Sequence, residues 1–123
     1  MTQKVTIALA QIASRVADKE YNIKLMEKEI KGASQKDADL IVFPELALTG
    51  YLCRDLIYEL AEPLPEGPSV REIAKIAKRE NMHVAFGMIE HSGKASAVVY
   101  NTSVLLGPSG VVGKYRKMNL HGN

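Results

Sequence analysis

Hydrophobic positions in the first third of the chain alternate between short continuous runs and one helical pattern. Val5–Ile12 is apolar and rich in β-branched residues near its start, which is typical of a buried strand. Asp18 can cap a helix that runs through Ser34, in which apolar residues recur on one face and lysines alternate with glutamates on the other. Leu40–Phe43 predicts a second buried strand, which Pro44 ends because proline has no amide donor.

The rest of the chain predicts two more helices and then three strands. A short helix is expected over Asp55–Leu60, before a proline-rich loop. Ser69 and Glu72 have the spacing of a capping box, which would begin a helix that continues through Glu80. Apolar runs beyond it predict strands over Val84–Ile89, Val98–Leu106 and, after a turn at 108–110, Val111–Tyr115.

This order of elements favours a single layered α/β domain. Strands that alternate with amphipathic helices are typical of α/β folds, and their continuous apolar runs suggest a sheet covered on both faces. No linker or internal repeat divides the chain of 123 residues. The expected fold class is therefore α/β, in one domain over 1–123.

Composition excludes several classes of function. The formal charge is +2, with 16 basic residues interspersed among 14 acidic ones, so a nucleic-acid surface is not expected. No apolar run is long enough to span a membrane, and the N-terminus lacks the features of a signal peptide. The single Cys53 cannot form an internal disulfide, which favours a reducing cytoplasm.

Two charged residues next to strands are candidates for chemistry. Glu45 follows a buried strand and a proline, at the kind of strand end where α/β active sites collect, although a solvent-facing loop glutamate fits the same pattern. Lys117 lies in a basic run that is ordinarily a solvated loop. Strand alternation places Lys114 and Arg116 on one side, and Tyr115 with Lys117 on the other.

Other reactive side chains form no convincing site. Cys53 has no histidine near it in sequence, and free cysteines are often small buried hydrophobes. His83, His91 and His121 lack the spacing of metal ligands, so no metal and no cofactor is expected.

Taken in order, the motifs of the chain resemble those of the nitrilase superfamily of carbon–nitrogen hydrolases. The resemblance extends over essentially the whole chain and rests on Ala10-Gln11, Phe43-Pro44-Glu45-Leu46, Thr49-Gly50-Tyr51, Tyr100-Asn101-Thr102 and Gly113-Lys114-Tyr115-Arg116-Lys117-Met118-Asn119-Leu120. It implies an α-β-β-α sandwich, of which this chain would be part, and a Glu-Lys-Cys triad. The family pattern usually has histidine where Asn119 stands, which leaves the lysine match intact.

The resemblance assigns roles to two residues of this chain. Glu45 matches the general base of the family and Lys117 matches its lysine, whereas the cysteine of the family follows the lysine at a later strand end. The chain is therefore expected to be the truncated N-terminal part of a hydrolase that cleaves amide, carbamoyl or nitrile bonds, and to be inactive alone. Cys53 matches no catalytic position.

Two alternatives to a simple amidase or nitrilase stay open. One is the glutaminase domain of a glutamine-dependent NAD synthetase, and the other is a non-catalytic interaction module in which a Glu45–Lys117 pair is purely structural. A small-molecule amide or nitrile is the expected substrate, with no nucleic-acid or membrane partner. Half a sandwich would leave apolar sheet surface exposed, so homo-oligomers are expected.

Overall fold

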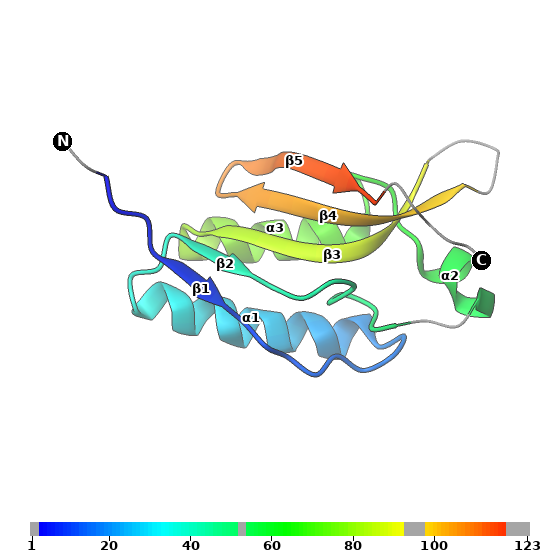
Figure 1. Ribbon diagram of the computed structural model, residues 1–123, viewed down its shortest axis with the longest axis horizontal. Helices are drawn as coiled ribbons and strands as arrows, with labels where there is room; N and C mark the ends of the chain where they lie inside the picture. Colours follow the sequence, from blue (N-terminus) through cyan, green and yellow to red (C-terminus); the bar gives the residue numbers. More distant parts are fainter. Residues whose placement is uncertain (1–2, 52–53, 93–97, 118–123) are drawn as a thin grey trace.

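The computed structural model describes residues 3–51, 54–92 and 98–117, which form one mixed sheet with helices packed against it (Figure 1). The predicted order of strands and helices is confirmed. The elements are β1 (Ile7–Leu9), α1 (Lys19–Gln35), β2 (Leu40–Val42), α2 (Arg54–Leu60), α3 (Pro68–Glu80), β3 (His83–His91), β4 (Val99–Gly107) and β5 (Gly110–Arg116).

The sheet has the strand order β1-β2-β3-β4-β5. The first three strands are parallel, and β4 and β5 continue the sheet in antiparallel fashion. The carboxyl ends of β2, β3 and β5 therefore lie at the same edge as the amino end of β4. β1 is shorter than predicted because its partner β2 offers only three residues for pairing.

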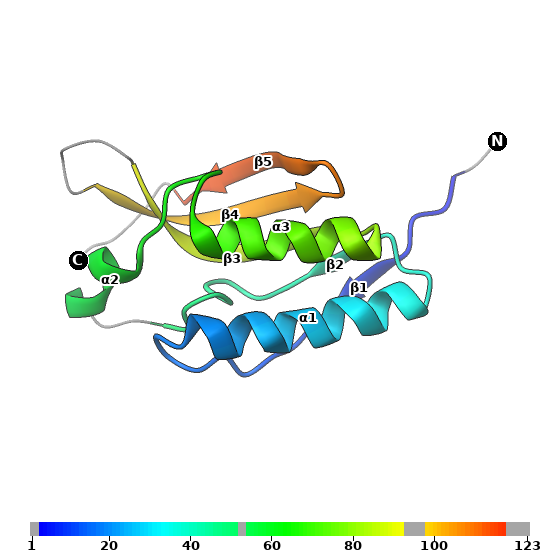
Figure 2. The ribbon, with the colours of Figure 1, turned by 180° about the vertical axis from the view of Figure 1, so that it is seen from behind.

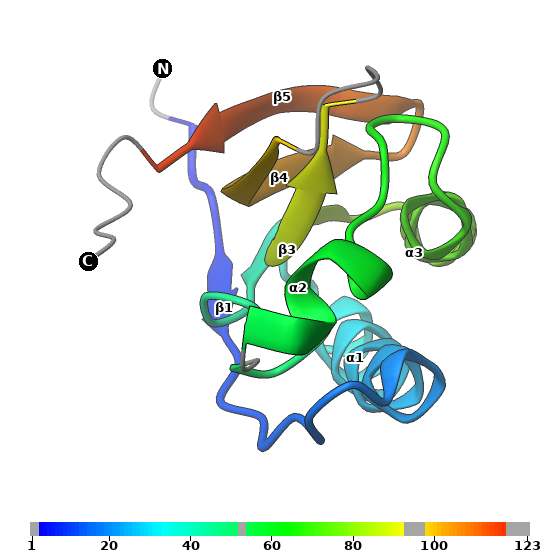
Figure 3. The same ribbon diagram turned by 90° about the vertical axis from the view of Figure 1, so that its right-hand side faces the viewer.

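Helices α1 and α3 lie side by side on one face of the sheet (Figures 2 and 3). Their inward side chains and those of the central strands form one core, which includes Met26, Ile30, Ile73 and Phe86. We call this side of the sheet the helix face. Alternation along β3 and β4 sends Val84, Phe86, Met88, Thr102, Val104 and Leu106 toward it.

The other side, which we call the open face, is exposed at β1 and β5. Ile7 is 53% exposed, Leu9 80% and Tyr115 65%. The expectation of a sheet covered on both faces is therefore wrong for this chain, because both long helices pack on one side.

The two long helices begin differently. Asp18 caps α1 as predicted, since its carboxylate accepts the amide of Tyr21 at 3.1 Å. The capping box at Ser69 is wrong: α3 begins at Pro68, whose fixed φ suits a first helical position, and Gly67 is the cap. The Ser69 amide donates instead to the buried carboxylate of Glu62, at 2.8 Å.

No helix in the described residues is long and apolar enough to cross a membrane. Location in the cytoplasm stays a prediction, as does the single-domain extent of 1–123.

Candidate active site

The candidate site is a pocket of about 420 Å³ on the open face, where β2 and β5 end and β4 begins. Sheet residues and the loop after β2 line it, including Val42, Gly87 and Ser103. Glu45 and Lys117 both reach this pocket, so the structure brings the two predicted residues together. Cys53 and His121 lie outside the described residues.

Glu45 stands on a loop that is fixed to the sheet by its backbone. The amide of Phe43 donates to Ala85 at 2.8 Å, and that of Leu48 donates to Gly87 at 3.2 Å. Leu46, with φ +55°, turns the chain sharply and is buried together with Ala47 and Leu48. Because the residues after Glu45 are buried and bonded to β3, the turn is held in place. The carboxylate of Glu45 lies at the surface of this turn.

Gly87 lets this loop lie directly on β3. A Cβ at that position would stand 2.3 Å from the amide nitrogen of Leu46 and 3.0 Å from Cα of Glu45. Only glycine allows the two backbones to approach this closely. The position of Glu45 therefore depends on a residue more than forty positions away in sequence.

Asn22 fixes the same loop from the helix side. This residue of α1 is fully buried; its side chain donates to the carbonyls of Arg15 and Leu48, at 2.8 and 2.9 Å, and accepts the amide of Arg15. Burial of a side-chain amide is costly unless its polar atoms are hydrogen-bonded. Both the oxygen and the nitrogen of the Asn22 side-chain amide are hydrogen-bonded. Sequence reasoning missed this residue because a helical Asn ordinarily indicates an exposed position.

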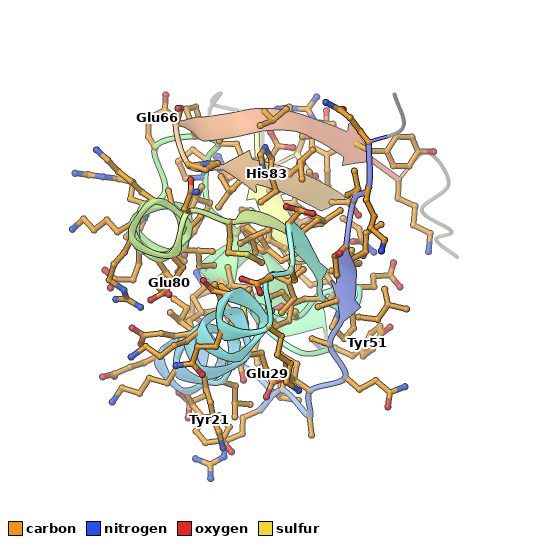
Figure 4. All side chains as sticks on the ribbon, turned by 90° about the vertical axis from the view of Figure 1, so that its left-hand side faces the viewer. Tyr21, Glu29, Tyr51, Glu66, Glu80 and His83 are labelled. Atoms are coloured by element: carbon orange, nitrogen blue, oxygen red, sulfur yellow. The ribbon has the colours of Figure 1, made fainter. Side chains whose placement is uncertain are left out.

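Among the described residues, three side chains contact the carboxylate of Glu45. Oε2 accepts Nδ2 of Asn101 at 2.6 Å and lies 3.4 Å from Nζ of Lys117. Oε1 lies 3.3 Å from the hydroxyl of Tyr51, which is long for an O–H···O bond. Figure 4 shows Tyr51 on the side of β1, away from Glu80 at the end of α3.

The contacts keep Glu45 ionised. The hydrogen bond from Asn101 lowers the pKa of Glu45, burial opposes this effect, and Lys117 and Tyr51 lower the pKa further. Because hydrogen bonds to the charged form favour it, Glu45 is a carboxylate near neutral pH and can accept a proton. The sequence pattern indicates Asn101 only as part of the motif Tyr100-Asn101-Thr102.

The basic run of β5 divides as strand alternation predicted. Lys117 faces Glu45 on the open face, while Lys114 and Arg116 contact Glu90 on the helix face. Arg116 makes two hydrogen bonds of 2.9 Å to Glu90 and stacks on the ring of Tyr100, 4.0 Å from its centroid. In the described residues, no group of three His, Cys, Asp or Glu side chains could hold a metal ion.

Comparison with known proteins decides the family. The family model for carbon-nitrogen hydrolases matches residues 6–122. The chain belongs to this family. A nitrilase of Pyrococcus abyssi is 36% identical over 118 residues, which are 94% of this chain and 44% of that protein. An (R)-stereoselective amidase of Pseudomonas sp is 34% identical over 115 residues, 93% of this chain and 40% of the amidase.

Solved structures of the family share the fold. The crystal structure of an amidase from Nesterenkonia sp. superposes with a TM-score of 0.83 at 22% identity, over 97% of this chain and 44% of that chain. This confirms the expected nitrilase-like α/β fold. The chain corresponds to the N-terminal part of its nitrilase relatives and spans less than half of their length.

Proposed function

We propose that this chain is the N-terminal part of a hydrolase that cleaves non-peptide carbon–nitrogen bonds, with Glu45 as general base and Lys117 as the cation that stabilises an oxyanion. The observation that carries the proposal is the Glu45–Lys117 pair, 3.4 Å apart in an open pocket at the strand ends. A carboxylate kept ionised beside an ammonium can accept a proton while the cation meets developing negative charge.

The nucleophile in this proposal is a cysteine thiol from a segment that these 123 residues do not contain. A mutant of the amidase from Nesterenkonia sp. AN1 carries the acetamide moiety of fluoroacetamide, covalently added at its active site cysteine. By analogy, Glu45 takes the thiol proton and the thiolate attacks the amide carbon. The proton then passes to the leaving amine, and Glu45 activates the water that cleaves the thioester.

The substrate class in this proposal is a small amide, with nitriles and carbamoyl compounds as related candidates. The proteins to which the chain is similar include an (R)-stereoselective amidase and the amidase from Nesterenkonia sp.. Amides are poor electrophiles, so both an activated thiolate and a cation beside the carbonyl oxygen are required. Lys117, which is half exposed, is able to reach a substrate oxygen in the pocket.

A chimera tests the proposal. Residues 1–123 are joined to the part of the Pyrococcus abyssi nitrilase that follows its matched region, and ammonia release is measured with short amides, nitriles and glutamine. We expect turnover of amides, reduced on the order of 10²–10⁴-fold by Glu45→Gln. Lys117→Ala should reduce it about 10²–10³-fold. Glu72→Gln and Lys75→Ala, on the exposed side of α3, are the matched controls.

The outcomes separate the alternatives. Turnover of glutamine above all other amides would favour the glutaminase alternative. A folded chimera whose turnover survives Glu45→Gln would contradict the role of Glu45 as general base. Loss of folding as the sole effect of Glu45→Gln would favour the non-catalytic module. The 123-residue chain alone is expected to be inactive; turnover by the chain that survives Cys53→Ala would show that no further cysteine is needed.

A further inference from the structure

Asn101 contacts both members of the Glu45–Lys117 pair. It lies at the start of β4, where its side chain points to the open face while that of Thr102 points to the helix face. Its backbone carbonyl accepts the amide of Lys117 at 2.9 Å. Its side-chain amide donates to Oε2 of Glu45 at 2.6 Å. One residue thus joins the end of β5 to the loop after β2.

The direction of the side-chain bond follows from chemistry. An ionised carboxylate only accepts hydrogen bonds, so the NH₂ group of Asn101 must face Glu45. Hydrogen bonds to a charged acceptor are short and strong, and the 2.6 Å separation is of that kind. The Lys117–Glu45 contact, at 3.4 Å between two partly exposed side chains, is weaker.

The two oxygens of Glu45 are therefore in different situations. Oε2 receives both Asn101 and Lys117, whereas the contact that Oε1 makes among the described residues is the long one from Tyr51. An oxygen already held by two donors has little capacity left for a third partner. Oε1 is the oxygen that can take up and release a proton.

We propose that Asn101 is a positioning residue that fixes Glu45 relative to Lys117 by holding Oε2, and so reserves Oε1 for proton exchange. The proton that leaves the cysteine S–H goes to Oε1, which gives a thiolate and a neutral carboxyl group, and it later leaves with the amine. This assignment of the two carboxylate oxygens rests on the proposed function. The position of Glu45 relative to Lys117, which Asn101 fixes, does not depend on that function.

Without Asn101 the carboxylate would lose its shortest contact. The side chain of Glu45 is 40% exposed and has several rotatable bonds, so the Lys117 contact alone would not select one rotamer. Misplacement of a catalytic group by about 1 Å can cost on the order of 100-fold in rate. Asn101 acts through Glu45 and need not touch the substrate.

The direct test measures the titration of Glu45 by carbon-detected NMR in the 123-residue chain carrying Leu9→Glu, which replaces an exposed apolar residue of the open face and should limit self-association. Asn101→Leu keeps the branching of the side chain and the backbone bond to Lys117 but removes the donor. We expect the pKa of Glu45 to rise toward its ordinary value in Asn101→Leu, and less in Tyr51→Phe. Ser103→Ala, two residues along the same face, is the matched control and should leave the titration unchanged.

The same chain with Asn101 in place gives a second readout if the Asn101→Leu variant does not fold. The side-chain NH₂ resonances of Asn101 should titrate at the same pH as the carboxyl of Glu45. Identical titration of Glu45 in the parent and in a folded Asn101→Leu chain would overturn the proposal. A Tyr51→Phe shift as large as that of Asn101→Leu would overturn the assignment of a free Oε1.

Turnover in the chimera separates this inference from the proposed function. Asn101→Leu should lower kcat roughly 10–100-fold with little change in KM. It should also move the acidic limb of the pH profile to higher pH, because activity is lost below the pKa of Glu45. If the chimera is inactive but the titration shifts as expected, the positioning role stands and the catalytic proposal fails. An unchanged titration overturns the positioning role whatever the turnover.

Discussion

The two faces of the sheet hold two glutamates that differ in their exposure to solvent and in the hydrogen bonds that they accept. Glu90, on the helix face, is 2% exposed and accepts hydrogen bonds from Thr102, Lys114 and Arg116. Glu45, on the open face, is 40% exposed and its contact with Lys117 is long. The cations that contact the two glutamates all lie within four consecutive residues, 114–117, at the end of β5.

The difference shows how one basic run serves two purposes. Burial alone would raise the pKa of Glu90, but the hydrogen bonds from Arg116, Lys114 and Thr102 outweigh it and lower that pKa to about 2. Glu90 is thus kept charged and has no capacity left for chemistry. Glu45 is also kept charged, yet one of its oxygens has only a weak partner and faces an open pocket.

The largest expected effect comes from Glu90→Gln. The change leaves Lys114 and Arg116 without their buried anion, so we expect the free energy of unfolding to fall by about 3 kcal/mol. Glu45→Gln is the matched variant on the other face and should change stability by less than about 1 kcal/mol, because partly exposed ion pairs contribute little. Urea denaturation at neutral pH measures both.

Acid provides a check on the same prediction. The pKa of Glu90 is about 2 when folded, against an ordinary 4.5, so its stabilisation is complete above the ordinary value. That contribution is lost as the pH falls from about 4.5 toward 2, because the unfolded state then binds the proton first. Glu90→Gln should flatten this part of the stability curve. An equal loss of stability in Glu45→Gln would remove the contrast between the faces.

Gly87→Ala should reduce stability by an intermediate amount and should also displace the Glu45 loop on the open face. Its Cβ would meet the amide of Leu46 at 2.3 Å, so the Glu45 loop must move off β3. We expect a loss of roughly 1–3 kcal/mol in stability, as for other overpacked sites. We also expect a rise in the pKa of Glu45 as the Asn101 bond lengthens.

Gly113→Ala is the matched control, since a Cβ there meets nothing within 4 Å. Urea denaturation gives the stability, and carbon-detected NMR gives the titration of Glu45. If Gly87→Ala destabilised the chain yet left Glu45 titrating as before, the loop would be held by contacts other than its fit on β3.

Local patterns in the sequence are sufficient to predict the elements and the division of β5. Alternation alone separates Lys117 from Arg116, because the period of a strand is two whatever it pairs with. The meeting of Glu45 with Lys117 is predicted only by resemblance to a family. Seventy-two residues separate them, and the order of strands in the sheet brings them together.

The contacts that hold the site could not be predicted from local patterns. Asn101 and Gly87 matter because of partners that lie far along the chain, and neither residue type indicates such a role by itself. Glu90 fell outside the predicted strand, which ended at Ile89, because a charged residue ordinarily ends a buried run. Its cations come from two strands away in the sheet.

The smallest expected effect concerns the open face itself. Ile7, Leu9 and Tyr115 expose apolar surface there, and such patches promote association. We expect the 123-residue chain to sediment as a multimer or aggregate, and Leu9→Glu to shift it toward the monomer. Tyr58→Glu, at an exposed position of α2, is the control.

A stable monomer at high concentration would show that the open face is tolerated in water. Burial of the open face would instead place Glu45 and Lys117 in a drier environment, where their attraction strengthens.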